Sequence, residues 1–387
     1  MLSLPNHFIV LAAHNLLQMS GDQTFPFRQD SNFWYLTGLQ ESDLVICIDT
    51  TSSKTILFLP ERSEFHTDWD GAYDISEFRV TSGIDTIEPI TKLNDYILNA
   101  HKKNQKIGYL EPLEARVEPY GFYSNPARAN LASIIKKIDP YPQDIRMDLA
   151  RLRQVKQPEE LAAIQSAIDI TGSAMLEVQD YIKSQNNLGL SEQEIENIFS
   201  KNFVKSGGHA YEPIIASGKN AATIHYMKNS QKLMQDAFLL MDVGAKVNGY
   251  SADISRTWFI GIKPTDRHKQ LYGAVLDIQN YAFELLKPGV ILKEYQDLVE
   301  VFAFKQFKKL NVNIEKYPHG FSHFLGLDTH DAGDYLSPLL ENSVITVEPG
   351  IYLPDEGIGI RIEDDVRITG DGIDVMSKQI PSNLLYL

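Results

Sequence analysis

The sequence is poor in cysteine, since Cys47 is the only one among 387 residues. One thiol cannot form an internal disulfide or the Cys-rich ligand set of a structural zinc site. No run of about 18 apolar residues is present, so the sequence predicts no membrane-spanning helix. Basic residues are also few, 36 against 51 acidic ones, which gives a net charge of −15. Because such a surface repels polyphosphate and anionic lipid, we expect neither nucleic acid nor membrane as a partner.

The motifs of two hydrolase classes are also missing. The sequence contains no G-x-S-x-G elbow and no H-E-x-x-H pair, so a serine esterase or a thermolysin-type protease has no support. The apolar run within residues 1–14 lacks a basic region before it, which argues against a signal peptide and predicts a cytoplasmic protein. With 43% hydrophobic and 22% charged residues, the composition predicts a soluble globular chain of two or three domains.

The first part of the chain, residues 1–140, has the pattern of a mixed α/β domain. Short apolar runs predict strands at 8–13, 44–48 and 55–59. A longer segment predicts a helix at 93–100. Two prolines within 139–143 then mark a boundary, because proline interrupts helices and strands. We therefore predict a smaller N-terminal domain at 1–140, a linker at 141–157 and a larger domain at 158–387.

The larger part opens with two predicted helices. Pro158 occupies a first-turn position where a missing N–H has no cost, and apolar residues then recur with helical spacing. Ser191 and Glu194 form a capping box at the start of the second helix. The order helix, helix, strands occurs twice, in about 158–260 and about 265–370. We therefore expect two similar α/β halves, related by a pseudo-twofold axis, that face each other across a cleft.

A predicted hairpin brings two aspartates together. Asn248-Gly249 is the commonest dipeptide of a type I′ turn, and an apolar run precedes it. A two-residue turn here pairs Asp242 with Ser255 and puts Asp242 and Asp253 diagonally on one face. Two carboxylates so placed repel each other unless a cation lies between them. A hairpin with two solvated acids has the same pattern, so the hairpin alone leaves a metal site and a solvated surface as alternatives.

The second half supplies further candidate ligands. Glu348 ends an apolar run, where a solvated acid is not expected. Arg361 and Glu363 share one face of a predicted strand that follows a Gly-rich turn. The segment 318–331 contains three histidines, which are His319, His323 and His330. Such histidines are usually surface residues, but beside two acidic strands we interpret them as candidate ligands.

Four carboxylates and one imidazole form a hard, oxygen-rich ligand set. Such a set favours Mn²⁺ over a thiolate-type zinc site, although zinc, cobalt or iron could also occupy it. Because two of the carboxylates can bridge, five side chains suffice for two metal ions about 3.5–4 Å apart. A water that bridges two such ions has its pKa lowered toward neutrality and becomes a nucleophile, which predicts a hydrolase.

Five segments of this region resemble the metal-ligand motifs of one family. They occur in the family's order and read MDVGA, SADISRT, HGFSHFLGLDTHD, TVEPGIY and RIEDD. Residues 155–375 are therefore similar to the pita-bread metallopeptidases, which include methionine aminopeptidase, prolidase and aminopeptidase P. Segments 22–38 and 319–331 resemble the aminopeptidase P branch. The resemblance covers nearly the whole chain and implies a two-part α/β fold in which the C-terminal part is a pita-bread domain.

The resemblance implies a role for each ligand. Asp242 would chelate one metal ion, and Asp253 and Glu363 would bridge both. His323 and Glu348 would hold the second ion, and Glu348 would also take the proton of the attacking water. The implied cofactor is a pair of divalent ions, most simply Mn²⁺, with Zn²⁺ or Co²⁺ as alternatives.

Other residues of the matching motifs are implied to act on the substrate. His225, in TIHYMKN, would contact the scissile carbonyl or another part of the substrate, and His330 would stabilise the tetrahedral intermediate. His319 would line the pocket for proline. Arg361 and Tyr352 are implied to orient the carboxylates and the subsite for proline. Tyr211, in SGGHAY, lies outside these motifs and is a further candidate to line the site.

The implied function is that of an Xaa-Pro aminopeptidase. Such an enzyme releases the N-terminal residue of a peptide whose second residue is proline, through a metal-bridging hydroxide. Two alternatives are a prolidase, restricted to Xaa-Pro dipeptides, and a non-catalytic peptide-binding module of the same fold, although the intact ligand set argues against the module. By resemblance we also expect a homo-oligomer, a dimer or a tetramer. Asp22 and Trp69 are candidates for residues that reach a neighbouring subunit's active site.

Overall fold

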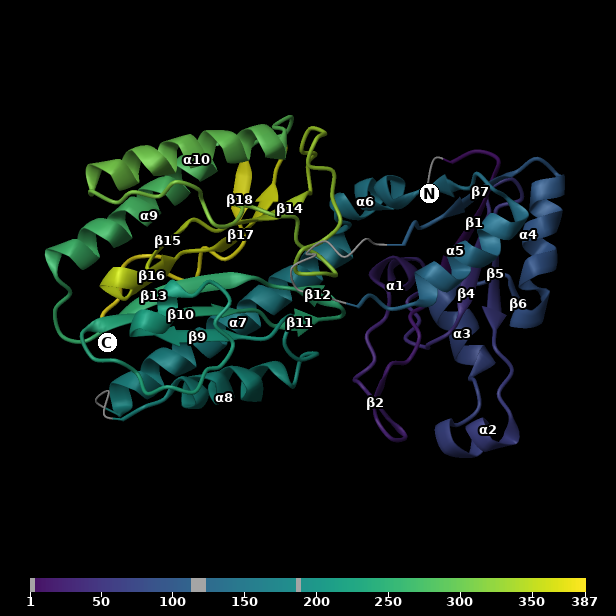
Figure 1. The fold of residues 1–387 in the computed structure, drawn as a ribbon, viewed down its shortest axis with the longest axis horizontal. Helices are drawn as coiled ribbons and strands as arrows, with labels where there is room; N and C mark the ends of the chain where they lie inside the picture. Colours follow the sequence, from purple (N-terminus) through teal and green to yellow (C-terminus); the bar gives the residue numbers. More distant parts are fainter. Residues whose placement is uncertain (1–3, 113–122, 186–188) are drawn as a thin grey trace. The chain divides into compact units, whose positions relative to one another are not determined.

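The computed structural model describes residues 4–112, 123–185 and 189–387 (Figure 1). The chain divides into two compact units, Met1–Leu149 and Ala150–Leu387. Both units combine helices and strands, as the apolar runs of the sequence predict. The predicted site residues that come from the matching motifs all lie in the second unit.

A mixed sheet of six strands lies at the centre of Met1–Leu149, in the order β6-β5-β4-β1-β7-β8. β1 pairs antiparallel with β4 and parallel with β7. The strands are β1 His7–Ala12, β4 Val45–Asp49, β5 Lys54–Leu59, β6 Thr86–Pro89, β7 Lys106–Tyr109 and β8 Gln143–Asp144. A separate small hairpin consists of β2 Gln18–Ser20 and β3 Gln23–Thr24. The three strands predicted in this part are confirmed to within one residue at each end.

Helices pack on both faces of this sheet, because alternate strand residues point to opposite sides. Ile9 and Phe33 belong to one core, and Val10, Cys47 and Ile97 belong to the other. Burial raises the pKa of the Cys47 thiol well above its usual value, which keeps this cysteine protonated. The helices are α1 Ser31–Thr37, α2 Glu64–Asp70, α3 Ile75–Ser82, α4 Leu93–Lys102 and α5 Ala127–Ile138.

The segment predicted as a linker, 141–157, is mostly regular secondary structure. It contains β8 and the helix α6, Arg146–Gln154. The carboxylate of Asp144 accepts a hydrogen bond of 3.0 Å from the backbone N–H of Arg146. Ile145 and Leu149 are fully buried in the core of the first unit. Proline content indicated a break here but not these buried side chains, and the limits of two independently folding domains stay a prediction.

The second unit, Ala150–Leu387, consists of long helices and short strands. The helices are α7 Pro158–Ser184, α8 Glu192–Phe203, α9 Asp266–Leu285 and α10 Leu292–Lys309. The strands of the first half are β9 Ile214–Ser217, β10 Ala237–Val243, β11 Lys246–Val247, β12 Tyr250–Ser251 and β13 Ile254–Ile260. Those of the second half are β14 Val344–Val347, β15 Gly350–Leu353, β16 Ile358–Arg361, β17 Asp364–Ile368 and β18 Ile373–Val375.

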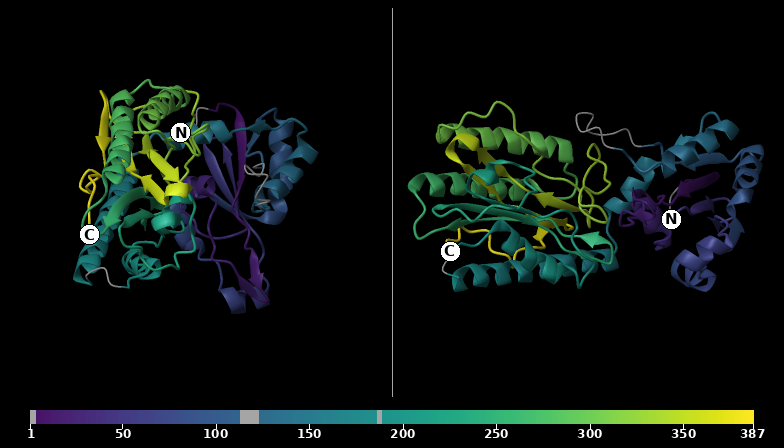
Figure 2. Two further views of the ribbon diagram at one scale, coloured as in Figure 1. Left: turned by 60° about the vertical axis from the view of Figure 1, so that its left-hand side comes forward. Right: turned by 60° about the horizontal axis from the view of Figure 1, so that its bottom comes forward.

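The strands of this unit lie between two helical layers (Figures 1 and 2). α9 and α10 cover one side of the strands, and α7 and α8 cover the other. Buried side chains such as Leu271 of α9, Val299 of α10 and Val366 of β17 belong to one continuous core. The predicted order helix, helix, strands is thus observed in both halves, with sheets ordered β13-β10-β9 and β14-β17-β18.

Two helix starts in the first half have the predicted chemistry. Pro158 is the first residue of α7. Ser191 caps α8: its hydroxyl accepts a hydrogen bond from the backbone N–H of Glu194, and the Glu194 carboxylate accepts one of 2.8 Å from the backbone N–H of Ser191. The capping box predicted from the sequence is therefore confirmed.

The predicted hairpin is confirmed as well. β10 pairs antiparallel with β13, with Asp242 opposite Ser255, and the pairing continues through β11 and β12. Asn248 and Gly249 have φ angles of 48° and 84°, which is the left-handed pair that a type I′ turn requires. This register puts Asp242 and Asp253 on one face of the hairpin.

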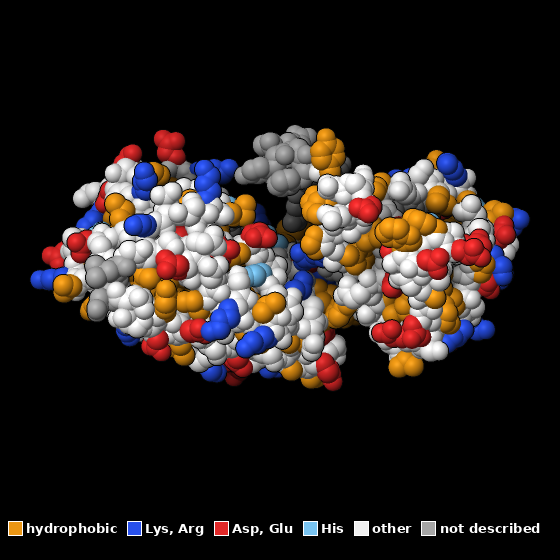
Figure 3. All heavy atoms as spheres, turned by 90° about the horizontal axis from the view of Figure 1, so that it is seen from below, with side chains coloured by type: hydrophobic (Ala, Val, Ile, Leu, Met, Phe, Trp, Pro, Cys, Tyr) orange, Lys and Arg blue, Asp and Glu red, His pale blue; other side chains and the backbone are white. Residues whose placement is uncertain are grey.

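Among the described residues, no helix combines the length and the apolarity needed to cross a bilayer. Acidic and basic side chains are interspersed over the face drawn in Figure 3, and histidine atoms are visible at the surface of the larger unit.

Candidate metal centre and active site

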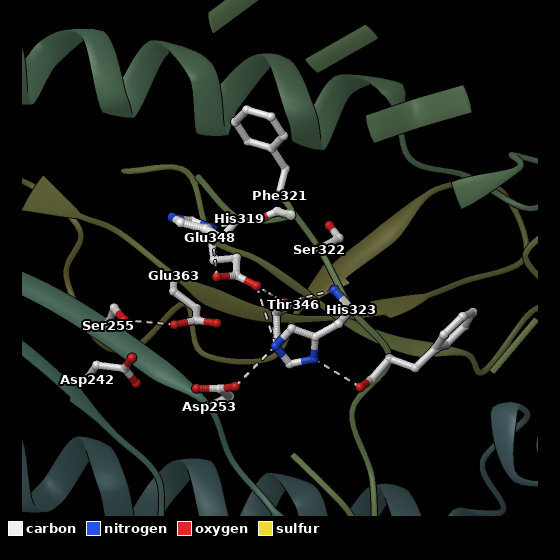
Figure 4. A network of polar contacts seen from close by, with 12 residues as sticks. Asp242, Asp253, Ser255, His319, Phe321, Ser322, His323, Thr346, Glu348 and Glu363 are labelled. Atoms are coloured by element: carbon white, nitrogen blue, oxygen red, sulfur yellow. Dashed lines mark hydrogen bonds and ion pairs between the residues drawn. The ribbon is translucent and has the colours of Figure 1, made fainter. Parts of the chain in front are cut away.

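A cavity of about 670 Å³ within Ala150–Leu387 contains nearly all of the predicted site residues. Those on its wall are Tyr211, His225, Asp242, Asp253, His319, His323, His330, Glu348, Arg361 and Glu363. Tyr352 is not on the wall, but its hydroxyl contacts both His319 and Arg361. The structure thus brings together side chains from both halves of the unit, and Figure 4 shows most of the candidate ligands converging.

Asp242 in β10 and Asp253 just before β13 form the first pair of acids. The hydroxyl of Tyr211 lies 2.6 Å from one oxygen of each carboxylate. Because a hydroxyl has one proton, it cannot donate to both acids at once, so it aligns the pair without neutralising it. Burial, and then the charges of the two aspartates, raise the pKa of Tyr211 well above its usual value, so the phenol stays protonated.

Glu363, between β16 and β17, adds a third acid. Its carboxylate accepts a hydrogen bond of 2.7 Å from the hydroxyl of Ser255, and its backbone N–H donates to the Ser255 carbonyl at 3.1 Å. Burial, and then the charges of Asp253 and Glu348, raise the pKa of Glu363 well above its usual value. Since Ser255 stands opposite Asp242 in the ladder, the hairpin orients the acid of the other half.

His323 directs one ring nitrogen toward these acids. Its Nδ1 lies 3.0 Å from the carbonyl oxygen of Phe324, which makes Nδ1 the donor. Its Nε2 lies 3.4 Å from a carboxylate oxygen of Asp253 and 3.4 Å from one of Glu348. Burial lowers the pKa of this imidazole, but Asp253 and Glu348 outweigh burial and raise the pKa to about 9. A ring held by a carbonyl on one side, with the other nitrogen facing carboxylates, is typical of metal-ligating histidines.

Glu348 directly follows β14 and completes the group of acids. Its backbone N–H donates to the carbonyl of Phe321 at 3.0 Å, which fixes the start of the side chain. Burial is the largest cause that raises the pKa of Glu348, to about 7, while His323 opposes this rise and Asp253 adds to it.

The residues present fit a divalent metal centre. Ligand atoms of Asp253, His323 and Glu363 lie within 4.8 Å of one another, and all three residues are buried. Closely spaced buried carboxylates repel one another, which raises their pKa values. A divalent cation relieves this repulsion, and hard oxygen donors with one imidazole suit such a cation.

A chain of hydrogen bonds runs along one side of the acids. Nη1 of Arg361 donates to the hydroxyl of Tyr352 at 2.8 Å, and that hydroxyl contacts Nε2 of His319 at 2.8 Å. Nδ1 of His319 faces the carbonyl oxygen of Gly320 at 2.7 Å, so Nδ1 carries the proton and Nε2 accepts. Burial, and then the charge of Arg361, lower the pKa of His319 to about 4. The ring is therefore neutral at pH 7.

Two further imidazoles of the wall, His225 and His330, are exposed. The ring of His330 lies against that of His323, with centroids 4.1 Å apart. His225 follows the short helix η3, Gly218–Ala222, and lies near enough to His319 to contribute to its lowered pKa. These exposed imidazoles face the solvent of the cavity and are accessible to a ligand.

Residues 162–370 match the family model of metallopeptidase family M24, and residues 1–108 match that of the aminopeptidase P N-terminal domain. The first match alone spans more than half of the chain. The chain belongs to metallopeptidase family M24. Membership of this family implies divalent metal ions at the site.

This M24 chain is similar over nearly its full length to curated peptidases. It is 29% identical to Xaa-Pro aminopeptidase 3 of Mus musculus, over 98% of this chain and 79% of that protein. It is also 29% identical to the Xaa-Pro aminopeptidase of Haemophilus influenzae, over 98% and 92% of the two chains. The mitochondrial Intermediate cleaving peptidase 55 of Arabidopsis thaliana is 25% identical, over 99% of this chain and 78% of that protein.

Solved structures of M24 peptidases have the same fold. The aminopeptidase P of Escherichia coli, with the inhibitor Pro-Leu, gives a TM-score of 0.79 at 25% identity and covers 98% of this chain and 92% of that one. The predicted family, the two-part α/β fold with a pita-bread domain and the class of metallopeptidase are therefore confirmed. These relatives do not favour the prolidase alternative. The roles of individual residues, including Asp22 and Trp69 in the first unit, stay predictions.

Sequence reasoning missed other parts of the M24 site. Gln296 of α10 lines the cavity, accepts a hydrogen bond of 2.8 Å from the backbone N–H of Phe321 and donates to the carbonyl of Ser322. The sequence around Gln296 is that of an ordinary amphipathic helix and contains no motif that indicates a site residue. The contact of Ser255 with the acids could have been predicted, because Ser255 lies two residues after Asp253 and therefore on the same face of the strand. Apolar residues of the wall had no sequence signal, and they include Ile214, Ile224 and Tyr335.

Proposed function

We propose that this chain is an Xaa-Pro aminopeptidase, which releases the N-terminal residue from peptides with proline in the second position. The observation that carries the proposal is the meeting of four carboxylates and one imidazole at one cavity, in a chain whose first 108 residues match the aminopeptidase P N-terminal domain. The wall around His319 receives the proline ring, and the acids and imidazoles supply the proton transfers.

The proposed cofactor is a pair of divalent cations. Mn²⁺ is the simplest choice for this oxygen-rich donor set, with Zn²⁺ and Co²⁺ as alternatives. The proposed ligands are Asp242 for one ion, Asp253 and Glu363 for both, and His323 and Glu348 for the other. When bound, the cations supply water of lowered pKa as the nucleophile for amide hydrolysis.

Glu348 is the proposed proton carrier. In the metal-free protein, burial raises the pKa of its carboxyl group to about 7, and a carboxyl group on the wall of this cavity can act as a general base and acid. Its second oxygen lies 3.5 Å from Nδ1 of His319, so it stands between the candidate ligands and the neutral imidazole. We infer that Glu348 accepts the proton of the attacking water and passes it to the proline nitrogen, which has no hydrogen of its own as a tertiary amide.

His330 and His225 are the proposed contacts for the substrate near the scissile bond. Both rings lie on the cavity wall and are exposed to a ligand. An N–H group aimed at the developing oxyanion contributes about 3–4 kcal/mol to the stability of a transition state. We assign this role to His330 and assign substrate positioning to His225.

Proline specificity is proposed to come from the wall around His319. Its imidazole is neutral and packs edge-on against the ring of Tyr352, with centroids 5.5 Å apart. Arg361 holds the hydroxyl of Tyr352 by a hydrogen bond. Tyr211 also lies on the cavity wall, with its hydroxyl against the carboxylate of Asp242. The imidazole of His319 on the cavity wall, held by the Tyr352 hydroxyl, accepts the pyrrolidine ring and does not depend on an N–H at the scissile nitrogen.

We also propose that the enzyme acts on proline-containing peptides in the cytoplasm as a homo-oligomer, a dimer or a tetramer. Because one relative is named as mitochondrial, cell fractionation with immunoblotting is the test of location. Analytical ultracentrifugation gives the oligomeric state.

A paired assay with added Mn²⁺ tests the activity. One reaction contains an Xaa-Pro-Xaa tripeptide, and the other contains the matching Xaa-Pro dipeptide. Release of the first residue from the tripeptide, abolished by a chelator, supports the aminopeptidase. Release from the dipeptide alone contradicts the proposal and assigns prolidase activity to the same residues. Failure of both reactions, in protein shown by elemental analysis to bind two metal ions, rejects the proposed substrate but not the metal centre.

A further inference from the structure

A buried cluster of charges lies behind the loop that carries His330. Arg153, near the end of α6, donates from Nη2 to Asp331 and, at 3.1 Å, to Asp328. Lys156 donates from Nζ to the other oxygen of Asp331 at 3.0 Å and to the carbonyl of Arg153 at 2.6 Å. The side chains of Arg153, Lys156 and Asp331 are 3%, 1% and 1% exposed. These three side chains are therefore enclosed by protein, while that of Asp328 is one-third exposed at the edge of the cluster.

The two acids of this cluster flank His330 along the chain. The backbone N–H of Asp331 donates to the carbonyl of Phe324 at 2.8 Å and closes the loop on itself. The N–H of Gly326 donates to the carbonyl of Asp328 inside that loop at 3.1 Å. A β-carbon at Gly326 would overlap the Asp331 carboxylate, so the loop backbone packs directly against the cluster.

The backbone that bears His330 is thus fixed on both sides. A carboxylate that accepts from a guanidinium and an ammonium together, in a buried place, has little freedom to rotate. Asp331 is the residue immediately after His330, and Asp328 is two residues before it. The exposed imidazole then stands against the ring of His323, at the edge of the candidate metal centre.

We propose that Arg153 and Lys156 are positioning residues for the hydrolytic reaction. By holding Asp328 and Asp331, they set where the imidazole of His330 stands relative to the reacting carbonyl. This inference rests on the proposed function, in which His330 stabilises the tetrahedral intermediate. Neither Arg153 nor Lys156 lines the cavity, so both side chains act through the loop and not on the substrate.

The test uses a variant that conserves charge, because removal of one partner would leave an uncompensated buried charge. Arg153→Lys keeps the positive charge, but the lysine side chain is shorter, so its ammonium group does not reach the position from which Nη2 of Arg153 contacts both Asp328 and Asp331. We expect kcat for an Xaa-Pro-Xaa tripeptide to fall by about 10- to 100-fold with KM little changed. A displacement of about 1 Å of a group that contacts the reacting atoms has an effect of this size.

A double-mutant cycle separates positioning from general destabilisation. When Arg153→Lys is added to His330→Ala, we expect less than about a twofold further loss of kcat, because the group being positioned is gone. Equal losses in the two backgrounds would overturn the proposal. Asp328→Asn, in a side chain that is one-third exposed, is a milder second variant that removes one end of the contact and should show the same dependence on His330.

Arg151→Lys is the matched control. Arg151 belongs to the same helix, but its side chain is 58% exposed and pairs with Asp334, outside the segment that flanks His330. We expect Arg151→Lys to leave kcat unchanged when it is added to the wild type and when it is added to His330→Ala.

A second measurement does not depend on turnover. In Zn²⁺-loaded protein with labelled histidine rings, the nuclear Overhauser cross-peak between His330 and His323 should be present and should weaken in Arg153→Lys. An unchanged cross-peak would overturn the positioning role. If the wild-type enzyme hydrolyses no Xaa-Pro peptide while the cross-peak still depends on Arg153, then the proposed function fails and the positioning of His330 stands.

Discussion

Nη2 of Arg361 donates a hydrogen bond of 2.5 Å to the carboxylate of Asp242, a residue 119 positions earlier in the chain. The same guanidinium also donates to the hydroxyls of Ser255 and Tyr352, each at 2.8 Å. Arg361 therefore joins an acid of the first half to the ring that borders His319 in the second half. The guanidinium of Arg361 therefore contacts both the candidate metal centre and the side chains proposed to receive the proline ring.

Arg361→Lys should weaken both metal binding and turnover. A lysine ammonium is a compact donor group and cannot reproduce the fixed fork that reaches Asp242, Ser255 and Tyr352 together. We expect a loss of about 10- to 100-fold in metal affinity or kcat/KM, as for other groups that orient metal ligands. Titration calorimetry with Mn²⁺ and steady-state kinetics measure these effects. Wild-type values for both would contradict the role of Arg361.

Glu348→Gln should abolish turnover without unfolding the protein. The amide is nearly isosteric with the carboxyl group but cannot carry the proton. The variant should keep the circular dichroism spectrum and thermal transition of the wild type. Glu356→Gln is the control, because Glu356 is an exposed acid that pairs with Arg267 away from the cavity. Normal kcat in Glu348→Gln would remove this residue from the mechanism.

His330→Ala should lower kcat by about 10²–10³-fold, because it removes one donor to the developing oxyanion. The imidazole is not a proposed ligand, so we expect metal content by elemental analysis to be unchanged. An unaltered kcat would exclude His330 from the reaction, whereas loss of metal would assign it to the ligand set.

Gly244→Ala should destabilise the hairpin that carries both aspartates. A β-carbon at Gly244 would overlap the backbone carbonyl of Ala252, which cannot move without opening the hairpin. We expect the free energy of unfolding to fall by about 1–3 kcal/mol. Gly273→Ala is the control, because Gly273 lies within α9 with no atom within 4 Å of the added carbon and should be neutral or slightly stabilising. Equal stabilities of the two variants in urea titrations would contradict this account.

Metal affinity should rise with pH from about pH 6 to about pH 9. Glu348 has a pKa of about 7 and His323 of about 9, and both must lose a proton before they can bind a cation. Protons therefore compete with the metal most strongly below pH 7, and binding should release them. Calorimetry with Mn²⁺ in two buffers of different ionisation enthalpy measures the number released. An affinity that does not change over this range would contradict the assignment of these two ligands.

The sequence allowed much of the scaffold to be predicted, because the decisive signals are local. The I′ turn at Asn248-Gly249 specified the hairpin register, and the Ser191 capping box specified the start of α8. Pro158 marked the start of α7. In each case a short stretch of chain has only one favourable backbone arrangement, so no knowledge of distant contacts is needed.

Long-range contacts could not be predicted in this way. The buried pairs of Arg153 with Asp331 and of Arg256 with Asp364 join residues that are 178 and 108 positions apart. Arginine and aspartate side chains are usually solvated, so the burial of these pairs gave no signal in the sequence. The burial of Ile145 and Leu149, which makes the predicted linker part of a core, depends on contacts with side chains far away in the sequence, so it was not predicted either.

The candidate ligands are distributed from Asp242 to Glu363, and the hairpin of the first half must meet strands of the second before they converge. During synthesis, a ribosome must therefore translate beyond codon 363 before all the acids exist in one chain. Products of a premature stop upstream of this point have an incomplete ligand set. The molecule thus gains its capacity to cut peptides only after the strands of both halves have been made.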